Sequence, residues 1–167
     1  MKNIILIGMP GAGKSTVGVI LAKTLGMHFI DTDIVLQQHA GRLLQEMIDQ
    51  EGPEAFLKTE ERTILSLEGA NTVIATGGSV VFSGRAMERL GSVGVVIYLD
   101  ISFDEMVLRL DNIMTRGIVL HAGENLHEMY NERAPLYEKY ADLTIDCSDA
   151  HVEQIVKKIV DELPRFR

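Results

Sequence analysis

The stretch Gly8-Met-Pro-Gly-Ala-Gly-Lys-Ser15 decides how this sequence folds, because it has the G-x-x-x-x-G-K-S pattern of a phosphate-binding P-loop. It follows a short apolar run, Ile4 to Ile7, and precedes a helical pattern that begins near Lys14. A buried strand, a glycine-rich turn and a helix N-terminus in this order direct consecutive backbone N–H groups toward phosphate oxygens. We therefore expect a nucleotide site here. The plainer interpretation is a glycine-rich turn followed by an accidental Lys-Ser pair.

The residues expected to bind ATP lie mainly in this loop and the helix turn that follows it. Lys14 is expected to reach the β- and γ-phosphates, and the Ser15 hydroxyl is expected to ligate Mg²⁺. Farther along the chain, Arg109 could stack on the adenine ring, with a surface ion pair as the alternative. The full expected set is Gly11, Ala12, Gly13, Lys14, Ser15, Thr16 and Arg109.

Composition narrows the class of protein. The chain has 167 residues and a formal net charge of −8, which predicts one domain over residues 1–167 and disfavours nucleic acid as a partner. No apolar stretch approaches the roughly 18 residues of a membrane span. Cys147 is the one cysteine, so an internal disulfide is excluded and a reducing cytoplasm fits. We expect a cytoplasmic monomer.

Apolar runs alternate with helical patterns along the chain, which is typical of an α/β fold with a parallel sheet and helices on both faces. One helix is expected to stop at Gly26, and another, from Gly84 to Leu90, to be closed by Gly91. A capping box, Ser102-Phe-Asp-Glu105, predicts a helix through about Asn112, and a last helix is expected over about 150–161. The expected strands are Asn3–Ile7, His28–Ile30, Thr72–Ala75, Val95–Leu99 and Leu143–Ile145.

Two regions do not fit a simple alternation of strands and helices. Residues 32–68 form one long helical insertion with breaks near Gly41 and Gly52-Pro53, and residues 115–124 are polar without a clear period. In a P-loop protein we expect the first to bind the phosphoryl acceptor and the second to form a lid. The alternative is a set of surface helices and a flexible loop without function.

Asp31-Thr-Asp33 directly follows the second expected strand. In extended chain, residues two apart point the same way, so both carboxylates are expected to project from the carboxyl edge of the sheet. Asp31 could hold Mg²⁺, and Asp33 could accept a hydrogen bond or proton from an acceptor hydroxyl. The alternative is that one of them caps the next helix.

Glycines and arginines complete the candidate site. Gly77 and Gly78 follow the third expected strand and would allow close approach of a substrate to the backbone, or form a tight turn. Arg116 lies in the expected lid and Arg133 in the helix after it. A guanidinium group suits phosphate or carboxylate, although a lone arginine on a helix is commonly a solvated charge.

Together these motifs resemble the shikimate kinases, which lie within the nucleoside-monophosphate-kinase-like P-loop group. The resemblance spans nearly the whole chain and implies transfer of the γ-phosphoryl of ATP to the 3-hydroxyl of shikimate. It also implies about five parallel strands in the order 2-3-1-4-5. The segments that carry it are Gly8–Thr16, Asp31-Thr-Asp33, Phe56 to Glu60, Val73-Ile-Ala-Thr-Gly-Gly78, Arg116 and Arg133-Ala-Pro-Leu-Tyr137.

The same resemblance implies roles for individual residues. Asp33 matches the acid that contacts the acceptor hydroxyl, and Asp31 matches the acid near Mg²⁺. Arg116 matches a lid arginine that neutralises phosphate charge, and Arg133 matches one of the arginines that hold the shikimate carboxylate. The residues that match the acceptor pocket are Asp33, Phe56, Gly77, Gly78 and Arg133.

The chain departs from the family pattern at the acceptor site. The family carries Phe-Arg-x-x-Glu where this chain has Phe56-Leu57-Lys58-Thr59-Glu60, so Leu57 stands where a carboxylate-binding arginine belongs. Lys58 is one helical step, about 100°, away from that position. Ser79 replaces the third glycine of Gly-Gly-Gly, and Gly117-Ile118 replaces Pro-Leu at the start of the lid.

We therefore expect an ATP- and Mg²⁺-dependent kinase whose partner is a small hydroxylated, carboxylate-bearing substrate, with shikimate the favoured acceptor. Leu57 and Ser79 favour one alternative, a related kinase for another polyol or hydroxy acid. A second alternative is a module that binds ATP without turnover. Asp31, Asp33 and Arg116 disfavour it, since passive binding requires none of them.

Overall fold

The computed structural model of this chain describes residues 2–111 and 117–166. In these residues, five parallel strands form one sheet in the order β2-β3-β1-β4-β5, which confirms the expected fold class and strand order. Each strand lies within one residue of its expected bounds. The strands are β1 (Asn3–Ile7), β2 (His28–Asp31), β3 (Thr72–Ala75), β4 (Gly94–Asp100) and β5 (Leu143–Asp146).

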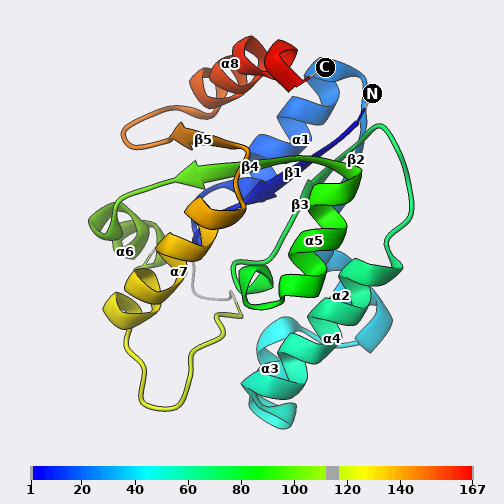
Figure 1. Cartoon of the computed structure of the whole chain (residues 1–167). Coiled ribbons are helices and arrows are strands. Elements are labelled where there is room, and N and C mark those ends of the chain that lie inside the picture. The colour runs from blue at the N-terminus through cyan, green and yellow to red at the C-terminus, as the bar shows by residue number, and fades with distance from the viewer. Residues whose placement is uncertain (1, 112–116, 167) are drawn as a thin grey trace.

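Helices cover both faces of this sheet. Figure 1 shows α1 (Lys14–Leu25) and α8 (Val152–Glu162) on one side, and α5 (Gly84–Val93) and α7 (Leu126–Tyr140) on the other. Helix α6 (Phe103–Asp111) follows β4, and short 3₁₀ turns occupy Val80–Phe82 and Leu163–Phe166. This is the three-layer arrangement that buries the apolar runs of a parallel sheet on both sides.

Local capping explains most of the helix ends. Helix α1 stops where Gly26 adopts a left-handed conformation with φ 67°, as expected. At the start of α6, the Glu105 backbone N–H donates to Ser102 Oγ at 3.2 Å, as the capping box predicts. The expected stop at Gly91 is wrong. Helix α5 continues through Gly91 to Val93, because the chain leaves it directly into β4, where Gly94 is extended.

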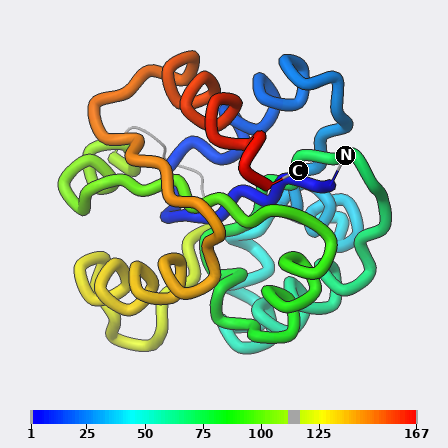
Figure 2. Tube along the Cα trace, turned by 45° about the horizontal axis from the view of Figure 1, so that its top comes forward, coloured from blue at the N-terminus to red at the C-terminus, as the bar shows by residue number. Residues whose placement is uncertain are grey.

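The long insertion consists of three helices that pack on one another. They are α2 (Thr32–Ala40), α3 (Leu44–Glu51) and α4 (Pro53–Ser66), and Figures 1 and 2 show them gathered at one end of the molecule. The breaks come where expected, at Gly41 with φ 66° and at Gly52 with φ 83°. The apolar side chains where these helices meet, together with Val119, form a second core, which we call the insertion cluster. Its buried members are Leu36, Leu44, Met47, Ile48, Phe56 and Val119.

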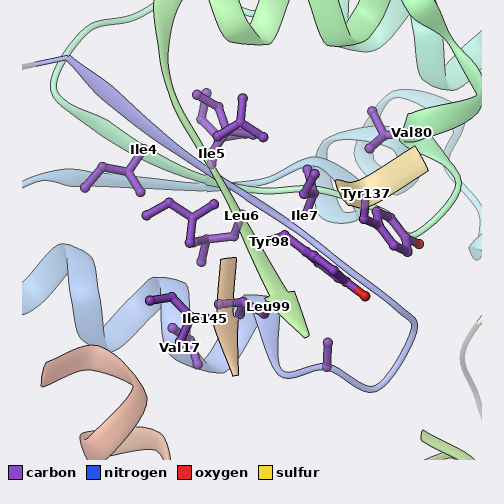
Figure 3. Close-up of a cluster of buried hydrophobic side chains, with 14 of the residues drawn as sticks. Ile4, Ile5, Leu6, Ile7, Val17, Val80, Tyr98, Leu99, Tyr137 and Ile145 are labelled. Atoms are coloured by element: carbon purple, nitrogen blue, oxygen red, sulfur yellow. The ribbon is translucent and has the colours of Figure 1, made fainter. Parts of the chain in front are cut away.

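The main core lies around β1, whose five residues are all buried. Side chains alternate along the strand. Figure 3 shows Ile7 beside Tyr137 of α7, whereas Leu6 points toward Val17 of α1. The rings of Tyr98 and Tyr137 stack with centroids 5.2 Å apart, which joins β4 to α7. Strand β1 is therefore held from both faces.

No helix in residues 2–111 or 117–166 is long and apolar enough to cross a bilayer. Cys147 is fully buried, and burial raises the pKa of its thiol to about 12. It is therefore a small core residue rather than a reactive thiol.

The two glycines at the end of α5 and the start of β4 give a paired stability prediction. A Cβ at Gly94 would lie 2.4 Å from the backbone oxygen of Asn3, whereas a Cβ at Gly91 would meet nothing within 4 Å. Gly94→Ala should destabilise the protein by about 1–3 kcal/mol, because backbone must shift. Gly91→Ala should stabilise it by about 0.5–1 kcal/mol, because alanine is the better helix residue. Urea unfolding of both variants measures this, and equal effects would contradict the placement of the end of α5.

Candidate active site

The P-loop connects β1 to α1 and needs its glycines for conformation. Gly11 and Gly13 have φ values of 81° and 90°, which other residues rarely adopt. Lys14 is 6% exposed, and its Nζ donates to the backbone oxygens of Gly8 at 2.7 Å and Met9 at 2.8 Å. The ammonium group is thereby held over the loop, where phosphate oxygens would enter.

Asp31 caps the helix that follows it, which is the alternative that the sequence left open, and it also contacts the P-loop serine. Its Oδ2 accepts a hydrogen bond of 2.5 Å from Ser15 Oγ, and its Oδ1 accepts one of 3.0 Å from the backbone N–H of Asp33, which caps α2. The expected extended geometry of residues 31–33 is wrong, because α2 begins at Thr32. Asp33 nevertheless faces the same region, since the first turn of α2 directs it into the cavity beside Lys14 and Ser15.

A small polar cavity lies at the carboxyl edge of the sheet. It brings together the P-loop, the insertion, the turn after β3, helix α7 and the segment after residue 116. The sequence-predicted residues that line it are Lys14, Ser15, Asp33, Phe56, Gly77, Gly78 and Arg133. Groups suited to a phosphate, a hydroxyl and a carboxylate therefore meet in one place.

Positions 77 and 78 require glycine because charged side chains lie very close to the backbone there. A Cβ at Gly77 would lie 2.6 Å from Glu60 Oε2 and 2.8 Å from Asp33 Oδ1. A Cβ at Gly78 would lie 3.1 Å from a guanidinium nitrogen of Arg133. Glycine at both positions leaves room for these charged groups to converge on the backbone turn.

Arg133 is 1% exposed although it carries a full charge. One terminal nitrogen donates to the Val119 backbone oxygen, and the guanidinium group lies 5.3 Å from the centre of the Phe82 ring. Its Nε has no hydrogen-bond partner among the described residues. A buried guanidinium with donor capacity to spare is suited to bind a carboxylate or phosphate that enters the cavity.

Glu60 is a cavity residue to which the sequence analysis assigned no role. It is 2% exposed, its Oε1 accepts a hydrogen bond of 2.7 Å from Ser79 Oγ, and its Oε2 has no hydrogen-bond partner among the described residues. Burial raises its pKa to about 7, with Asp33 adding to the rise and the Ser79 hydrogen bond opposing it. The signal was available, because Glu60 is one helical turn after Phe56, on the apolar face of α4.

Leu57, which departs from the family pattern on α4, and its neighbour Lys58 both lie away from the cavity. Leu57 is half-buried, packs against the insertion cluster and is not among the described residues that line the cavity. Lys58 is exposed. Neither side chain therefore supplies a cation to the acceptor pocket in this arrangement.

The remaining candidates lie outside the main cavity. Thr16 and Arg109 line a second groove beside the start of α8, together with Gly11, Ala12 and Gly13. Arg109 pairs with Glu105 at 2.5 Å and donates to the Gly11 backbone oxygen at 3.0 Å, so the ion-pair alternative is realised at the edge of the P-loop.

The first two positions of the expected lid, Thr115 and Arg116, lie outside the described residues. Of the described part, residues 117–119 line the cavity. Gly117 approaches α3 closely, since a Cβ there would lie 2.6 Å from Leu44 Cβ. A larger residue at position 117, including the proline of the family pattern, does not fit this packing.

Comparison with known proteins identifies the family. The model of the shikimate kinase family matches residues 10–164. The chain belongs to this family. The shikimate kinase of Vibrio cholerae serotype O1 is 37% identical over 165 residues, which cover 97% of this chain and 95% of that protein.

Solved shikimate kinases have the same architecture. The Acinetobacter baumannii enzyme, determined in complex with shikimate, superposes with a TM-score of 0.91 at 28% identity and covers 100% of this chain and 95% of that one. The Aquifex aeolicus enzyme gives a TM-score of 0.84 at 29% identity, with coverage of 97% and 96%. Membership of the shikimate kinase family confirms the resemblance drawn from the motifs and implies use of ATP.

The buried acid of the cavity makes stability depend on pH. The pKa of Glu60 is raised from 4.5 to about 7, so the native state binds this proton more tightly than the unfolded state. The stabilisation is complete below the unfolded pKa and is lost as pH rises through about 7, by on the order of 3 kcal/mol. Glu60→Gln removes this titration, so the free energy of unfolding of the variant minus that of the wild type should increase from about pH 4 to about pH 8.

Denaturant unfolding at several pH values measures this difference. Glu54→Gln, which removes an exposed acid from the first turn of the same helix, is the matched control. A difference for Glu60→Gln that does not change with pH would contradict the burial of the acid.

Proposed function

We propose that this chain transfers the γ-phosphoryl group of ATP to the 3-hydroxyl of shikimate. The observation that carries the proposal is that Lys14, Asp33 and Arg133 line one polar cavity. A cation over a P-loop, a carboxylate in the same cavity and a buried guanidinium suit, respectively, a transferring phosphoryl group, an attacking hydroxyl and a substrate carboxylate.

The catalytic roles follow from position and charge. Lys14 would exchange its backbone partners for phosphate oxygens, and Arg116, assigned through the family, would neutralise further charge on the phosphoryl group. Asp33 would orient or deprotonate the acceptor hydroxyl. Phosphoryl transfer needs mainly in-line positioning and charge neutralisation, so these few groups suffice.

Magnesium fits the residues beside the P-loop. Ser15 Oγ and Asp31 Oδ2 lie 2.5 Å apart, and both are oxygen donors of the kind that Mg²⁺ prefers. Asp31 would act directly or through a water molecule. When bound, the ion neutralises charge on the β- and γ-phosphates. For the nucleotide base, the groove lined by Thr16 and Arg109 supports placement of the adenine there.

One observation favours a second candidate, a kinase of this family with a different hydroxy acid or polyol as acceptor. The cation that the family places at position 57 is absent, and Ser79 adds a hydroxyl to the pocket wall. Loss of one charge-assisted contact costs about 1.5–3 kcal/mol, or roughly ten- to a hundred-fold in affinity. Such a loss weakens shikimate binding without removing the phosphoryl-transfer groups.

The proposal predicts shikimate-dependent release of ADP. The purified protein with Mg²⁺-ATP should release ADP much faster when millimolar shikimate is added, in a coupled spectrophotometric assay. Lys14→Ala should abolish this turnover because the phosphate loses its cation, whereas Lys23→Ala, at an exposed position on the same helix, should not. Release of ADP that does not respond to shikimate, with a response to another hydroxy acid, would establish the second candidate instead.

Restoring the family residue at position 57 tests how the acceptor is held. Leu57→Arg should lower the Michaelis constant for shikimate by about ten-fold with little change in kcat, because a second guanidinium would reach the carboxylate. Lys58→Arg, a change at an exposed position, is the control and should have no effect. An unchanged or higher Michaelis constant for Leu57→Arg would contradict the proposal that an arginine at position 57 extends past the insertion cluster to the acceptor.

A further inference from the structure

The two departures from the family pattern in the acceptor pocket, at positions 57 and 79, both affect the carboxyl group of Glu60. Residues 57 and 60 are one turn apart on α4, so an arginine at position 57 would lie next to Glu60. In this chain Leu57 packs into the insertion cluster instead. Ser79, where the family has glycine, donates its hydroxyl to Glu60 Oε1 at 2.7 Å. Glu60 therefore receives a hydrogen bond from Ser79, whereas the family pattern places a cation next to this acid.

The second oxygen of Glu60 is left for something that enters the cavity. Glu60 lines the cavity, and its Oε2 has no hydrogen-bond partner among the described residues. Oε2 and Asp33 Oδ1 both approach the same point beside the Gly77 Cα, at 2.6 Å and 2.8 Å from where a Cβ would lie. A buried polar atom without a partner is costly, so its retention at the wall of a binding cavity calls for a ligand.

We propose that Glu60, held in place by Ser79, is a specificity-determining residue that donates a hydrogen bond from its protonated carboxyl group to an oxygen of the acceptor, close to the hydroxyl that Asp33 faces. This inference rests on the proposed function and adds a contact to it. Ser79 is a positioning residue, since it fixes Oε1 and leaves Oε2 without a partner beside Gly77. The contact selects acceptors with a second oxygen beside the reacting hydroxyl.

The surroundings of Glu60 account for the proton. Burial is the largest cause of the raised pKa, and Asp33 on α2 raises it further. Arg133 on α7, Lys14 on α1 and the hydrogen bond from Ser79 oppose the rise, and the pKa settles at about 7. The Tyr137 hydroxyl on α7 stays neutral, because burial raises its pKa to about 12.

Ionisation of Glu60 should weaken acceptor binding. The ionised carboxylate has no proton to donate, and it places a second negative charge beside Asp33 and an anionic substrate. The Michaelis constant for shikimate should therefore rise with pH once Glu60 loses its proton, whereas that for ATP should not follow the same curve.

Steady-state kinetics of the full chain with Mg²⁺-ATP test this. In the wild type and in Glu54→Gln, an exposed control on the same helix, the Michaelis constant for shikimate should rise about ten-fold from about pH 6 to about pH 8. In Glu60→Gln it should stay low and flat, since the amide keeps the Ser79 hydrogen bond and still donates to the acceptor.

A second variant tests the positioning role and does not depend on the folding of the first. Ser79→Ala removes a hydrogen bond that lowers the pKa of Glu60, so the rise in the Michaelis constant should move to higher pH while kcat changes little. If Ser79 acted only in folding, the pH midpoint of the rise in the Michaelis constant would not change, and that result would contradict the positioning role.

The outcomes separate this inference from the function on which it rests. Shikimate-dependent turnover in the wild type, with the same rise in Michaelis constant retained in Glu60→Gln, would keep the function and overturn the role of Glu60. A Michaelis constant raised at every pH in Glu60→Gln would also overturn it, because an ionised carboxylate would then be the binding form. Absence of shikimate-dependent turnover in the wild type would overturn the proposed function and the contact together.

Discussion

The site depends on the pairing of β1 with β3 on one side and β4 on the other. This central strand is buried from both faces, and the chain leaves its carboxyl end directly into the P-loop. Because all five strands are parallel, the segments that follow β2 and β3 emerge at the same edge. Asp33, the Gly77-Gly78 turn and Lys14 come from three distant parts of the sequence, and the parallel arrangement of the strands brings them to one cavity.

Charge balance in the cavity follows from the same arrangement. The described lining contains two cations, Lys14 and Arg133, and two acids, Asp33 and Glu60. Two ionised acids would cancel the cations and repel an anionic substrate. With a pKa of about 7 for Glu60, the cavity keeps a net positive charge at neutral and lower pH. Burial of one acid thus leaves the cavity able to accept both a phosphate and a carboxylate.

Local signals made the strands, the P-loop and the breaks in the insertion predictable. Apolar runs mark buried parallel strands, and the left-handed glycines at Gly26, Gly41 and Gly52 end helices without regard to the rest of the fold. The end of α5 was not predictable in this way, because Gly91 does not adopt a left-handed conformation and the start of β4 sets the boundary. The rotation of α4 about its axis depends on packing against α2, α3 and Val119, so the sequence did not reveal that Leu57 faces the insertion cluster. The face of Glu60 was predictable from its spacing to Phe56, because both residues line the cavity one helical turn apart.

The most direct test of this account is a crystal structure of the chain with shikimate and ADP. The account predicts the shikimate carboxylate against the guanidinium group of Arg133, with one ring hydroxyl at Asp33 and a neighbouring oxygen at Glu60. A shikimate molecule bound outside the cavity, or bound with its carboxylate away from Arg133, would contradict the assignment of this cavity to the acceptor.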